Sequence, residues 1–184
     1  MAGHTFLGIS GSLRRDSLNR KLIREAARLY GADRYIEADL DLPLFNEDIE
    51  DSTGIPESVQ TLADQIAGAD AVVISACEYN KSISGVLKNA LDWVSRTKGS
   101  PWRDKPLAIM SAAGGRAGGE RAQFALRLCL VSFRPRLVPG PELMVARAEH
   151  EFDADGRLTN ERYLKVLTEQ MEQLRADATA RQAA

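Results

Sequence analysis

The stretch GISGSLRRDSLNRKL, residues 8–22, gathers hydrogen-bond donors at the start of a predicted helix. Its candidate donors are the side chains of Ser10, Ser12, Ser17, Arg14, Arg15 and Asn19. The first turn of a helix adds unpaired backbone N–H groups and a partial positive charge, so this set suits a phosphate group. The alternative interpretation is that Asp16 or Ser17 caps the helix and the arginines are solvated.

The phosphate type can be narrowed from the absence of two motifs. The stretch contains neither GxxxxGK[ST], which marks the P-loop of nucleoside triphosphate enzymes, nor GxGxxG, which marks a dinucleotide turn. A monophosphate therefore fits better than a triphosphate or a dinucleotide.

Two further segments carry residues that suit a flat ring. In CEYNKSISGVLKNALDWVSR, residues 77–96, Tyr79 and Asn80 precede a helix that opens at Ser84, and an aromatic beside an amide can pack on a ring and bond its edge. In SAAGGRAGGERAQ, residues 111–123, four glycines leave the backbone free to approach a planar ligand. Taken singly, the first could be an ordinary strand-to-helix turn and the second a flexible linker.

The elements around these segments predict an α/β fold. Apolar strands are expected at 5–10, 34–38, 69–76 and 106–113, with a fifth, broken by Pro139 and Pro141, at a sheet edge. Helices with apolar stripes are expected at 17–30, 56–66, 84–95, from near 119, and at 160–178. This alternation predicts a flavodoxin-like three-layer sandwich, with a five-stranded parallel sheet in the order 2-1-3-4-5.

This topology places the three segments together. Ligands of such sheets bind beyond the carboxyl ends of the strands, and the three segments follow the first, third and fourth strands. A phosphate at the first loop and a flat ring between the other two describe a site for flavin mononucleotide (FMN).

Composition excludes several other classes. The 184 residues carry a net charge of −2, which gives no electrostatic reason to expect nucleic acid or an anionic membrane as a partner. With two cysteines in no CxxC pattern and two histidines, the sequence predicts neither a disulfide framework nor a metal centre. The expected setting is a reducing cytoplasm. No signal peptide or membrane span is expected.

The chain resembles the flavodoxin-like, NADPH-dependent FMN reductases, which include bacterial chromate, quinone and azo-dye reductases. The resemblance spans about residues 5–175 and rests on GSLRRDSLNRKL, EYNKSISGVLKNALDW, SAAGGRAGGERAQ and LPLFNEDIE. It implies that FMN is held by residues of all three loops. We assign the cofactor contacts to Ser10, Ser12, Arg14, Ser17, Leu18, Asn19, Cys77, Glu78, Tyr79, Asn80, Lys81, Ser111, Gly114, Gly115 and Arg116.

Within that set, the resemblance gives each loop a task. The first loop holds the phosphate, Glu78 to Asn80 run beside the ring and the ribityl chain, and Ser111, Gly114 and Gly115 line the other side of the ring. The family commonly has proline at the positions of Cys77 and Ser84 and an aromatic at that of Lys81, so this chain departs from the pattern there. Family members are usually dimers or tetramers, which makes a homodimer or homotetramer the expected assembly.

The expected reaction is hydride transfer from NADPH or NADH to N5 of FMN, followed by two-electron reduction of a small acceptor such as a quinone, chromate or an azo compound. The cofactors carry the reactive atoms, so no catalytic side chain is assigned. Arg116 and Arg121 are candidate contacts for NADPH phosphate, or else solvated charges or intersubunit ion pairs.

Three rival interpretations are kept. A flavodoxin-type electron carrier would favour a more acidic surface, and a slow flavin-dependent sensor is also compatible with the sequence. A phosphatase with Cys77 as nucleophile is disfavoured, because Ile83 stands where that chemistry wants an arginine, and Cys77 is then a small buried residue.

The remaining features are assigned structural roles. His4 and His150 are expected at the surface, and Trp93 and Trp102 in packing or subunit contacts. The acidic residues of 47–51 fit a solvated loop or a subunit contact better than a metal site. One domain is expected over residues 1–184, with a disordered tail from about residue 177.

Overall fold

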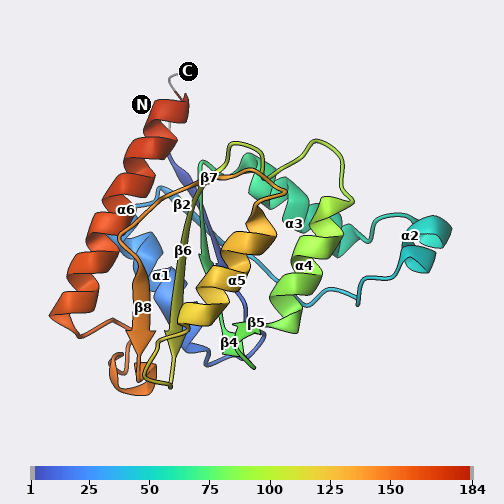
Figure 1. Cartoon of the computed structure of the whole chain (residues 1–184). Coiled ribbons are helices and arrows are strands. Elements are labelled where there is room, and N and C mark those ends of the chain that lie inside the picture. Colours follow the sequence, from blue (N-terminus) through green and yellow to red (C-terminus); the bar gives the residue numbers. More distant parts are fainter. Residues whose placement is uncertain (1–2, 183–184) are drawn as a thin grey trace.

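The computed structural model describes residues 3–182, and a parallel sheet runs through its centre. The strands of this sheet are β1 (Thr5–Ser10), β2 (Arg34–Glu37), β3 (Ala71–Ser75), β6 (Pro106–Ala113), β7 (Arg136–Leu137) and β8 (Leu143–Ala146). Their order is β2-β1-β3-β6, after which β7 pairs with the start of β6 and β8 with its end (Figure 1). The predicted α/β class and the order 2-1-3-4-5 are confirmed, because β7 and β8 are two pieces of the fifth strand.

Helices cover both faces of the sheet. On one face, α1 (Leu18–Tyr30) and α6 (Glu161–Gln182) pack against Phe6, Val73 and Met110. On the other face lie α3 (Glu57–Gly68), α4 (Gly85–Ser95) and α5 (Glu120–Leu130) (Figure 1). Each of these five helices turns its apolar stripe to the sheet, which produces two hydrophobic cores separated by the strands.

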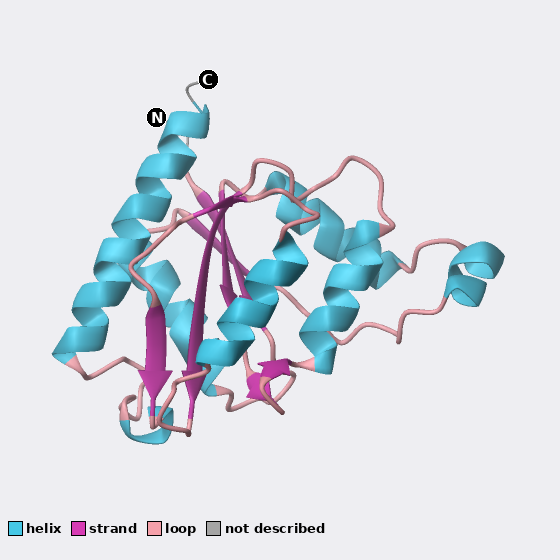
Figure 2. Cartoon of the chain, in the orientation of Figure 1, coloured by secondary structure: helices cyan, strands magenta, loops and turns pink. Residues whose placement is uncertain are grey.

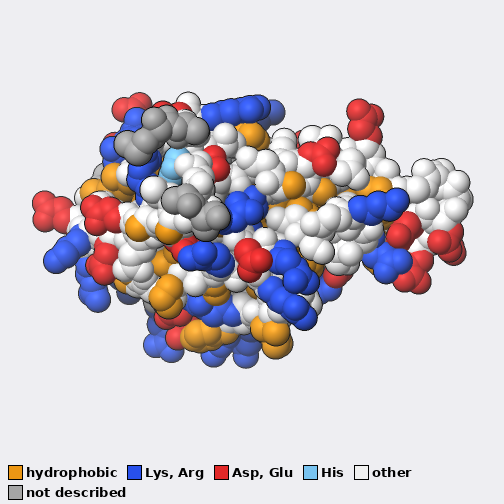
Figure 3. Space-filling model, turned by 90° about the horizontal axis from the view of Figure 1, so that it is seen from above, with side chains coloured by type: hydrophobic (Ala, Val, Ile, Leu, Met, Phe, Trp, Pro, Cys, Tyr) orange, Lys and Arg blue, Asp and Glu red, His pale blue; other side chains and the backbone are white. Residues whose placement is uncertain are grey.

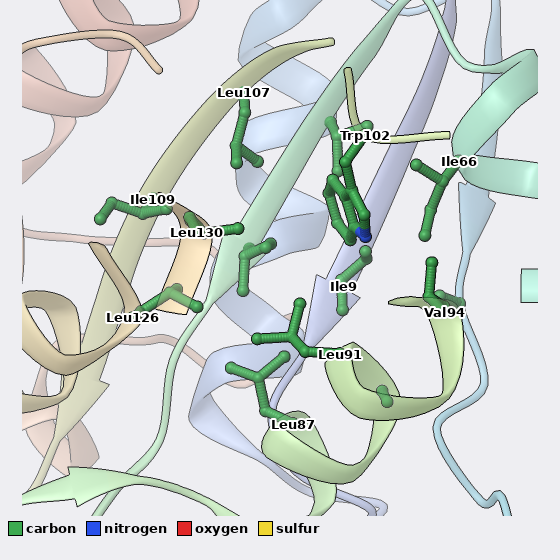
Figure 4. Close-up of a cluster of buried hydrophobic side chains, with 14 of the residues drawn as sticks. Ile9, Ile66, Leu87, Leu91, Val94, Trp102, Leu107, Ile109, Leu126 and Leu130 are labelled. Atoms are coloured by element: carbon green, nitrogen blue, oxygen red, sulfur yellow. The ribbon is translucent and has the colours of Figure 1, made fainter. Parts of the chain in front are cut away.

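The core beneath α4 includes Trp102, whereas the Trp93 ring packs edge-on against Phe45. Figure 4 shows Leu87, Leu91 and Val94 of α4 packed near Ile9, with Trp102 inserted beside them. Trp102 is 3% exposed and Trp93 0% exposed, so both are packing residues, as predicted.

Three short elements were not expected from the sequence. Helix α2 (Glu47–Thr53) lies within the predicted polar loop, where Asn46 caps it by accepting a hydrogen bond from the Asp48 N–H at 2.9 Å. It buries no residue, so it has no apolar periodicity to reveal it. The hairpin of β4 (Glu78–Tyr79) and β5 (Ser82–Ile83) and the 3₁₀ turn η1 (Ala148–His150) are likewise too short to leave a periodic pattern.

Two predictions about single regions are wrong. Helix α6 continues to Gln182 and buries Ala178, where a disordered tail was expected from about residue 177; residues 183–184 lie outside the described residues. His4 is 6% exposed rather than at the surface, because its imidazole Nδ1 lies 2.5 Å from the Tyr30 hydroxyl. His150 is exposed, as predicted.

The fold places the three loops at one end. The strands run toward the end that carries the β4–β5 hairpin, whereas the described chain ends lie at the opposite end (Figure 2). Within residues 3–182, no helix is both long enough and apolar enough to cross a membrane. Over the same residues, no three His, Cys, Asp or Glu side chains come together in a way that could hold a metal ion.

Candidate functional site

The loop after β1 is folded by its own serines. Ser10 Oγ accepts a hydrogen bond from the Ser12 N–H at 3.3 Å, and Ser12 Oγ accepts one from the Arg14 N–H at 3.2 Å. The Ser17 N–H donates to the Arg14 carbonyl at 3.2 Å and closes the turn. These bonds bring the chain from the sheet to the start of α1 and leave the side chains of Arg14 and Arg15 exposed.

Helix α1 begins at this loop with free hydrogen-bonding capacity. Ser17 occupies the N-cap position, yet its side chain makes no capping hydrogen bond, although the residue is only 5% exposed. The first turn of α1 contains no acidic residue to complement the positive end of the helix. The alternative interpretation, in which Ser17 serves as a cap of this helix, therefore does not describe its side chain.

Asn19 forms its hydrogen bonds with groups of the protein itself. Its Nδ2 donates to the Ala112 carbonyl at 2.9 Å and to Cys77 Sγ at 3.2 Å, and its Oδ1 accepts from the Ser75 hydroxyl at 2.8 Å and the Ala112 N–H at 3.0 Å. The amide is fully used within the protein. It ties α1 to the ends of β3 and β6 and so fixes the three loops relative to one another.

The loop after β3 begins with Cys77 at the bottom of the site. Cys77 is 6% exposed, and burial raises the pKa of its thiol, while hydrogen bonds with Ser12 and Asn19 and the charge of Arg14 act in the opposite direction. Ser84, at the far end of this segment, donates to the Gly11 carbonyl at 2.6 Å and accepts from the Leu87 N–H at 3.2 Å. Ser84 is thus the N-cap of α4, at the residue where the sequence predicts this helix to open, and it also joins the first two loops.

The hairpin between these residues presents Tyr79 to solvent. Asn80 and Lys81 form its turn with φ angles of 51° and 67°, and a turn of this kind requires positive φ at both central positions. Tyr79 is 53% exposed. Glu78 points the other way: its Oε2 accepts from the backbone N–H groups of Arg121 and Ala122, at 3.0 and 3.2 Å, and caps α5.

The loop after β6 is held from below. Ser111 is fully buried, donates to the Gly118 carbonyl at 2.6 Å and accepts from Gln123 Nε2 at 2.8 Å. Gly119 has a φ of 92°, and a Cβ there would lie 2.8 Å from Ser111 Cβ, so only glycine fits. A Cβ on Gly114 would lie 3.2 Å from Glu149 Oε2, which leaves little room beside that backbone.

A hollow of about 170 Å³ lies where the three loops meet. Its lining includes most of the predicted cofactor residues: Ser12, Arg14, Ser17, Leu18, Asn19, Cys77, Glu78, Tyr79 and Gly114. Ala112 and Ala113 also line it, although the sequence did not single them out. An alanine side chain carries no polar group that could single these two residues out in the sequence.

The other predicted residues lie outside this lining. Ser10 and Ser111 support the loops from within, Asn80 and Lys81 form the exposed hairpin turn, and Gly115 is exposed next to Gly114. Arg116 lines a separate hollow of about 370 Å³ with Arg162 and Tyr163. Larger hollows thus exist elsewhere, but the one at the strand ends is distinguished by its unused donors.

Comparisons with known proteins show the family of the chain. A family model described as NADPH-dependent FMN reductase matches residues 5–150. The chain belongs to this family. This FMN reductase family member is 42% identical over 170 residues to an NAD(P)H-dependent FMN reductase of Pseudomonas aeruginosa, with 91% of each chain covered. It is 36% identical over 165 residues to a quinone reductase of Escherichia coli K12, with 88% of each covered.

A solved structure extends the likeness to the fold. FerB of Paracoccus denitrificans, described as a flavoenzyme NAD(P)H:(acceptor) oxidoreductase, superposes with a TM-score of 0.85 at 32% identity, covering 96% of this chain and 98% of FerB. The predicted class is confirmed: the protein is an NAD(P)H-dependent FMN oxidoreductase, with FMN as its flavin and NAD(P)H as its electron donor.

The residues at the hollow fit FMN on physical grounds. Ser17 offers a hydroxyl without a capping partner, α1 offers the positive end of its dipole, and Arg14 offers an exposed cation, which together suit a phosphate. The backbone of Ala112 to Gly114 forms a wall without bulky side chains, which suits the close approach of a flat group.

Proposed function

We propose that this FMN reductase family member reduces small quinones by two electrons at the expense of NAD(P)H. The observation that carries the proposal is the hollow at the strand ends, where Ser17 and the first turn of α1 hold unused donors. Bound there, FMN supplies an acceptor for hydride from NAD(P)H and a donor of two electrons to a second substrate. The quinone class is favoured by the quinone reductases among the relatives.

In this proposal each loop has a separate task. Arg14, the hydroxyls of Ser12 and Ser17 and the backbone N–H groups at the start of α1 bind the phosphate. Tyr79 and the backbone of Ala112 to Gly114 flank the flat part of the cofactor. Asn19 and Glu78 act indirectly: Asn19 holds the loops in register, and Glu78 fastens the hairpin to α5.

The volume of the hollow bears on substrate entry. At about 170 Å³ it is smaller than the roughly 300–1,000 Å³ of a pocket that encloses a small molecule. One chain therefore covers only part of the cofactor and leaves an open side, where donor and acceptor can bind in turn. An open side shared by both substrates predicts ping-pong kinetics and tolerance of several acceptors, including chromate and azo compounds.

A second copy of the chain is the proposed neighbour of this open site. Helix α5 exposes Phe124, Leu128 and Val131 by 51%, 76% and 70%, a spacing that puts them on one side of the helix. The start of α5 is bonded to Glu78 at the rim of the hollow, so a copy docked on this helix would lie beside the site. The variant Leu128→Lys is expected to shift the sedimentation coefficient toward the monomer, whereas Leu44→Lys, at an exposed position away from α5, is the matched control.

The deciding experiment is anaerobic. The protein, loaded with FMN, is mixed with NADPH or NADH, and the visible absorbance is followed before and after addition of 1,4-benzoquinone. Bleaching by NAD(P)H and recovery with quinone, at a rate that matches steady-state turnover, would support the proposal. A flavodoxin-type carrier or a slow sensor would leave the absorbance unbleached by NAD(P)H on that time scale.

A further inference from the structure

Cys77 is the one chemically reactive side chain, among the described residues lining the hollow, that the proposed function does not use. It follows the carboxyl end of β3, is 6% exposed, and its Sγ accepts a hydrogen bond from Asn19 Nδ2 at 3.2 Å. Cys77 is thus a buried residue that lines the hollow proposed for the cofactor. The other cysteine, Cys129, is half-buried on α5 and does not line the hollow.

A second observation indicates that the space above this thiol accepts a ligand. Ser17, 5% exposed and without a side-chain cap bond, lines the same hollow. A cavity of roughly 150 Å³ holds a benzene ring, and the hollow measures about 170 Å³. A single six-membered ring therefore fits beside Cys77 when FMN is absent.

We propose that Cys77 is a site of covalent modification by small quinones in the flavin-free protein, and that bound FMN protects it. The inference rests on the proposed function, because it takes the electrophile from the proposed substrate class. The ligand class is a quinone with an unsubstituted ring carbon. The bound quinone fills the space that FMN needs, so a flavin-free chain that has reacted with quinone can no longer bind FMN.

The step is a conjugate addition. The Cys77 sulfur forms a bond to an unsubstituted ring carbon, and the electrons of the ring double bond move to a carbonyl oxygen. That oxygen takes up the proton released by the thiol, and the hydrogen on the attacked carbon then shifts to the second oxygen through solvent. The product is a hydroquinone thioether that contains every atom of thiol and quinone, so no separate oxidant or reductant is needed.

The site also has groups that assist a thiol in this step. Asn19 Nδ2 donates a hydrogen bond to the sulfur, and Ser12 lies within hydrogen-bonding distance of it. The Arg14 guanidinium adds a positive charge nearby, and all three groups favour the nucleophilic thiolate. Burial acts against the thiolate, so the reaction is expected to be slower than that of a free exposed thiol.

The test uses the full-length chain with Cys129→Ser, which leaves Cys77 as its single cysteine. Flavin-free and FMN-loaded samples are treated with 1,4-benzoquinone in the absence of NAD(P)H, and intact mass and peptide mass are followed over time. The chain with both Cys129→Ser and Cys77→Ser measures addition to amines, and hydroquinone replaces quinone as the non-electrophilic control. FMN binding is measured on each sample by quenching of flavin fluorescence.

We expect one quinone per flavin-free chain, located on Cys77, and loss of FMN binding in proportion to the modification. With FMN at about 100 times its Kd, the rate should fall about 100-fold, because the free fraction of the site falls in that proportion. A flavin-free chain that binds FMN but whose Cys77 stays unmodified overturns this inference and leaves the proposed function intact. Equal modification with and without bound FMN overturns it as well, whereas a chain that binds no FMN contradicts the proposed function itself.

Discussion

Polar groups at the two ends of the parallel sheet differ in how far they are hydrogen-bonded within the protein. At the carboxyl end, the Ser17 hydroxyl makes no capping hydrogen bond, and the first turn of α1 contains no acidic side chain. At the amino end, two buried polar side chains are paired: Lys105 Nζ donates to the carbonyls of Ala67 and Ala69, at 2.9 and 2.5 Å, and His4 bonds to Tyr30. Figure 3 looks onto this end, where acidic and basic side chains are interspersed.

This difference distinguishes polar groups that can bind a ligand from polar groups that stabilise the fold. Polar groups that are already paired hold elements together, since removing one partner leaves the other buried without a bond. A polar group without a hydrogen-bonding partner lowers the free energy of unfolding of the ligand-free protein. A ligand that bonds to this group raises the free energy of unfolding. Substitutions at the two ends should therefore change different measured quantities.

The largest effect is expected from Asn19→Ala. Asn19 lies at the carboxyl end of the sheet, where FMN is proposed to bind, but it is hydrogen-bonded within the protein, so its loss should change both stability and binding. Loss of its four hydrogen bonds should lower the free energy of unfolding by about 3 kcal/mol and weaken FMN binding as well, because the three loops lose their common tie. Urea unfolding and FMN titration measure the two quantities.

Gln170→Ala is the matched control for this variant. Gln170 is also a buried amide, and its Nε2 donates to the carbonyls of Ile109 and Pro141, at 3.1 Å each. Its loss should lower stability by about 1–3 kcal/mol and leave the FMN affinity of the folded protein unchanged. Unchanged FMN affinity in Asn19→Ala would contradict the role assigned to Asn19.

Arg14→Ala sharpens the comparison, because it removes an exposed group of the binding end. A charged hydrogen-bonding partner of a phosphate contributes about 1.5–3 kcal/mol, so the Kd for FMN should rise about 10- to 100-fold. The free energy of unfolding should change by less than about 0.5 kcal/mol. Arg15→Ala, at the exposed neighbour that does not line the hollow, should leave both quantities unchanged.

Lys105→Met tests the amino end through pH. Burial, assisted by Arg181, lowers the pKa of Lys105 from 10.5 to about 8. Between these two pH values the unfolded chain keeps a proton that the folded chain releases, so this group makes stability rise with pH, by at most about 1.4 kcal/mol per pH unit. Urea unfolding of both proteins between pH 8 and 10 should show stability rising more steeply in the wild type, and parallel curves would contradict the assignment.

The smallest effect is expected from Glu78→Gln. The glutamine oxygen can still accept from the N–H groups of Arg121 and Ala122, so the change is the loss of a negative charge at the start of α5, worth about 0.3–1 kcal/mol of unfolding free energy. FMN affinity should change by less than about threefold. Glu120→Gln, in the same first turn, is the matched control, and an effect confined to FMN affinity would assign Glu78 to direct contact.

The sequence predicts the positions of the loops better than the roles of their residues. Continuous apolar runs gave the bounds of β1 and β6 correctly, because a strand covered on both faces must be apolar throughout. Asn19 and Glu78 were recognised as important polar residues, but their partners are chosen by tertiary structure. Asn19, for example, bonds a carbonyl 93 residues away.

Burial accounts for the rest of the difference. Ser111 is a hydroxyl at the end of a strand, as a ligand contact would be, and only the position of Gln123 and Gly118 shows that it faces inward. Ala112 and Ala113 also line the hollow, and their side chains carry no polar group that could signal this in the sequence.

A comparison of FMN with riboflavin tests the central claim most directly, because the two differ only in the phosphate. If the start of α1 and the loop after β1 bind that group, the full-length protein should bind FMN at least about 100-fold more tightly than riboflavin, a difference of about 2.7 kcal/mol. The difference should shrink in Arg14→Ala and persist in Arg15→Ala. Equal affinities for FMN and riboflavin in the unsubstituted protein would contradict the account.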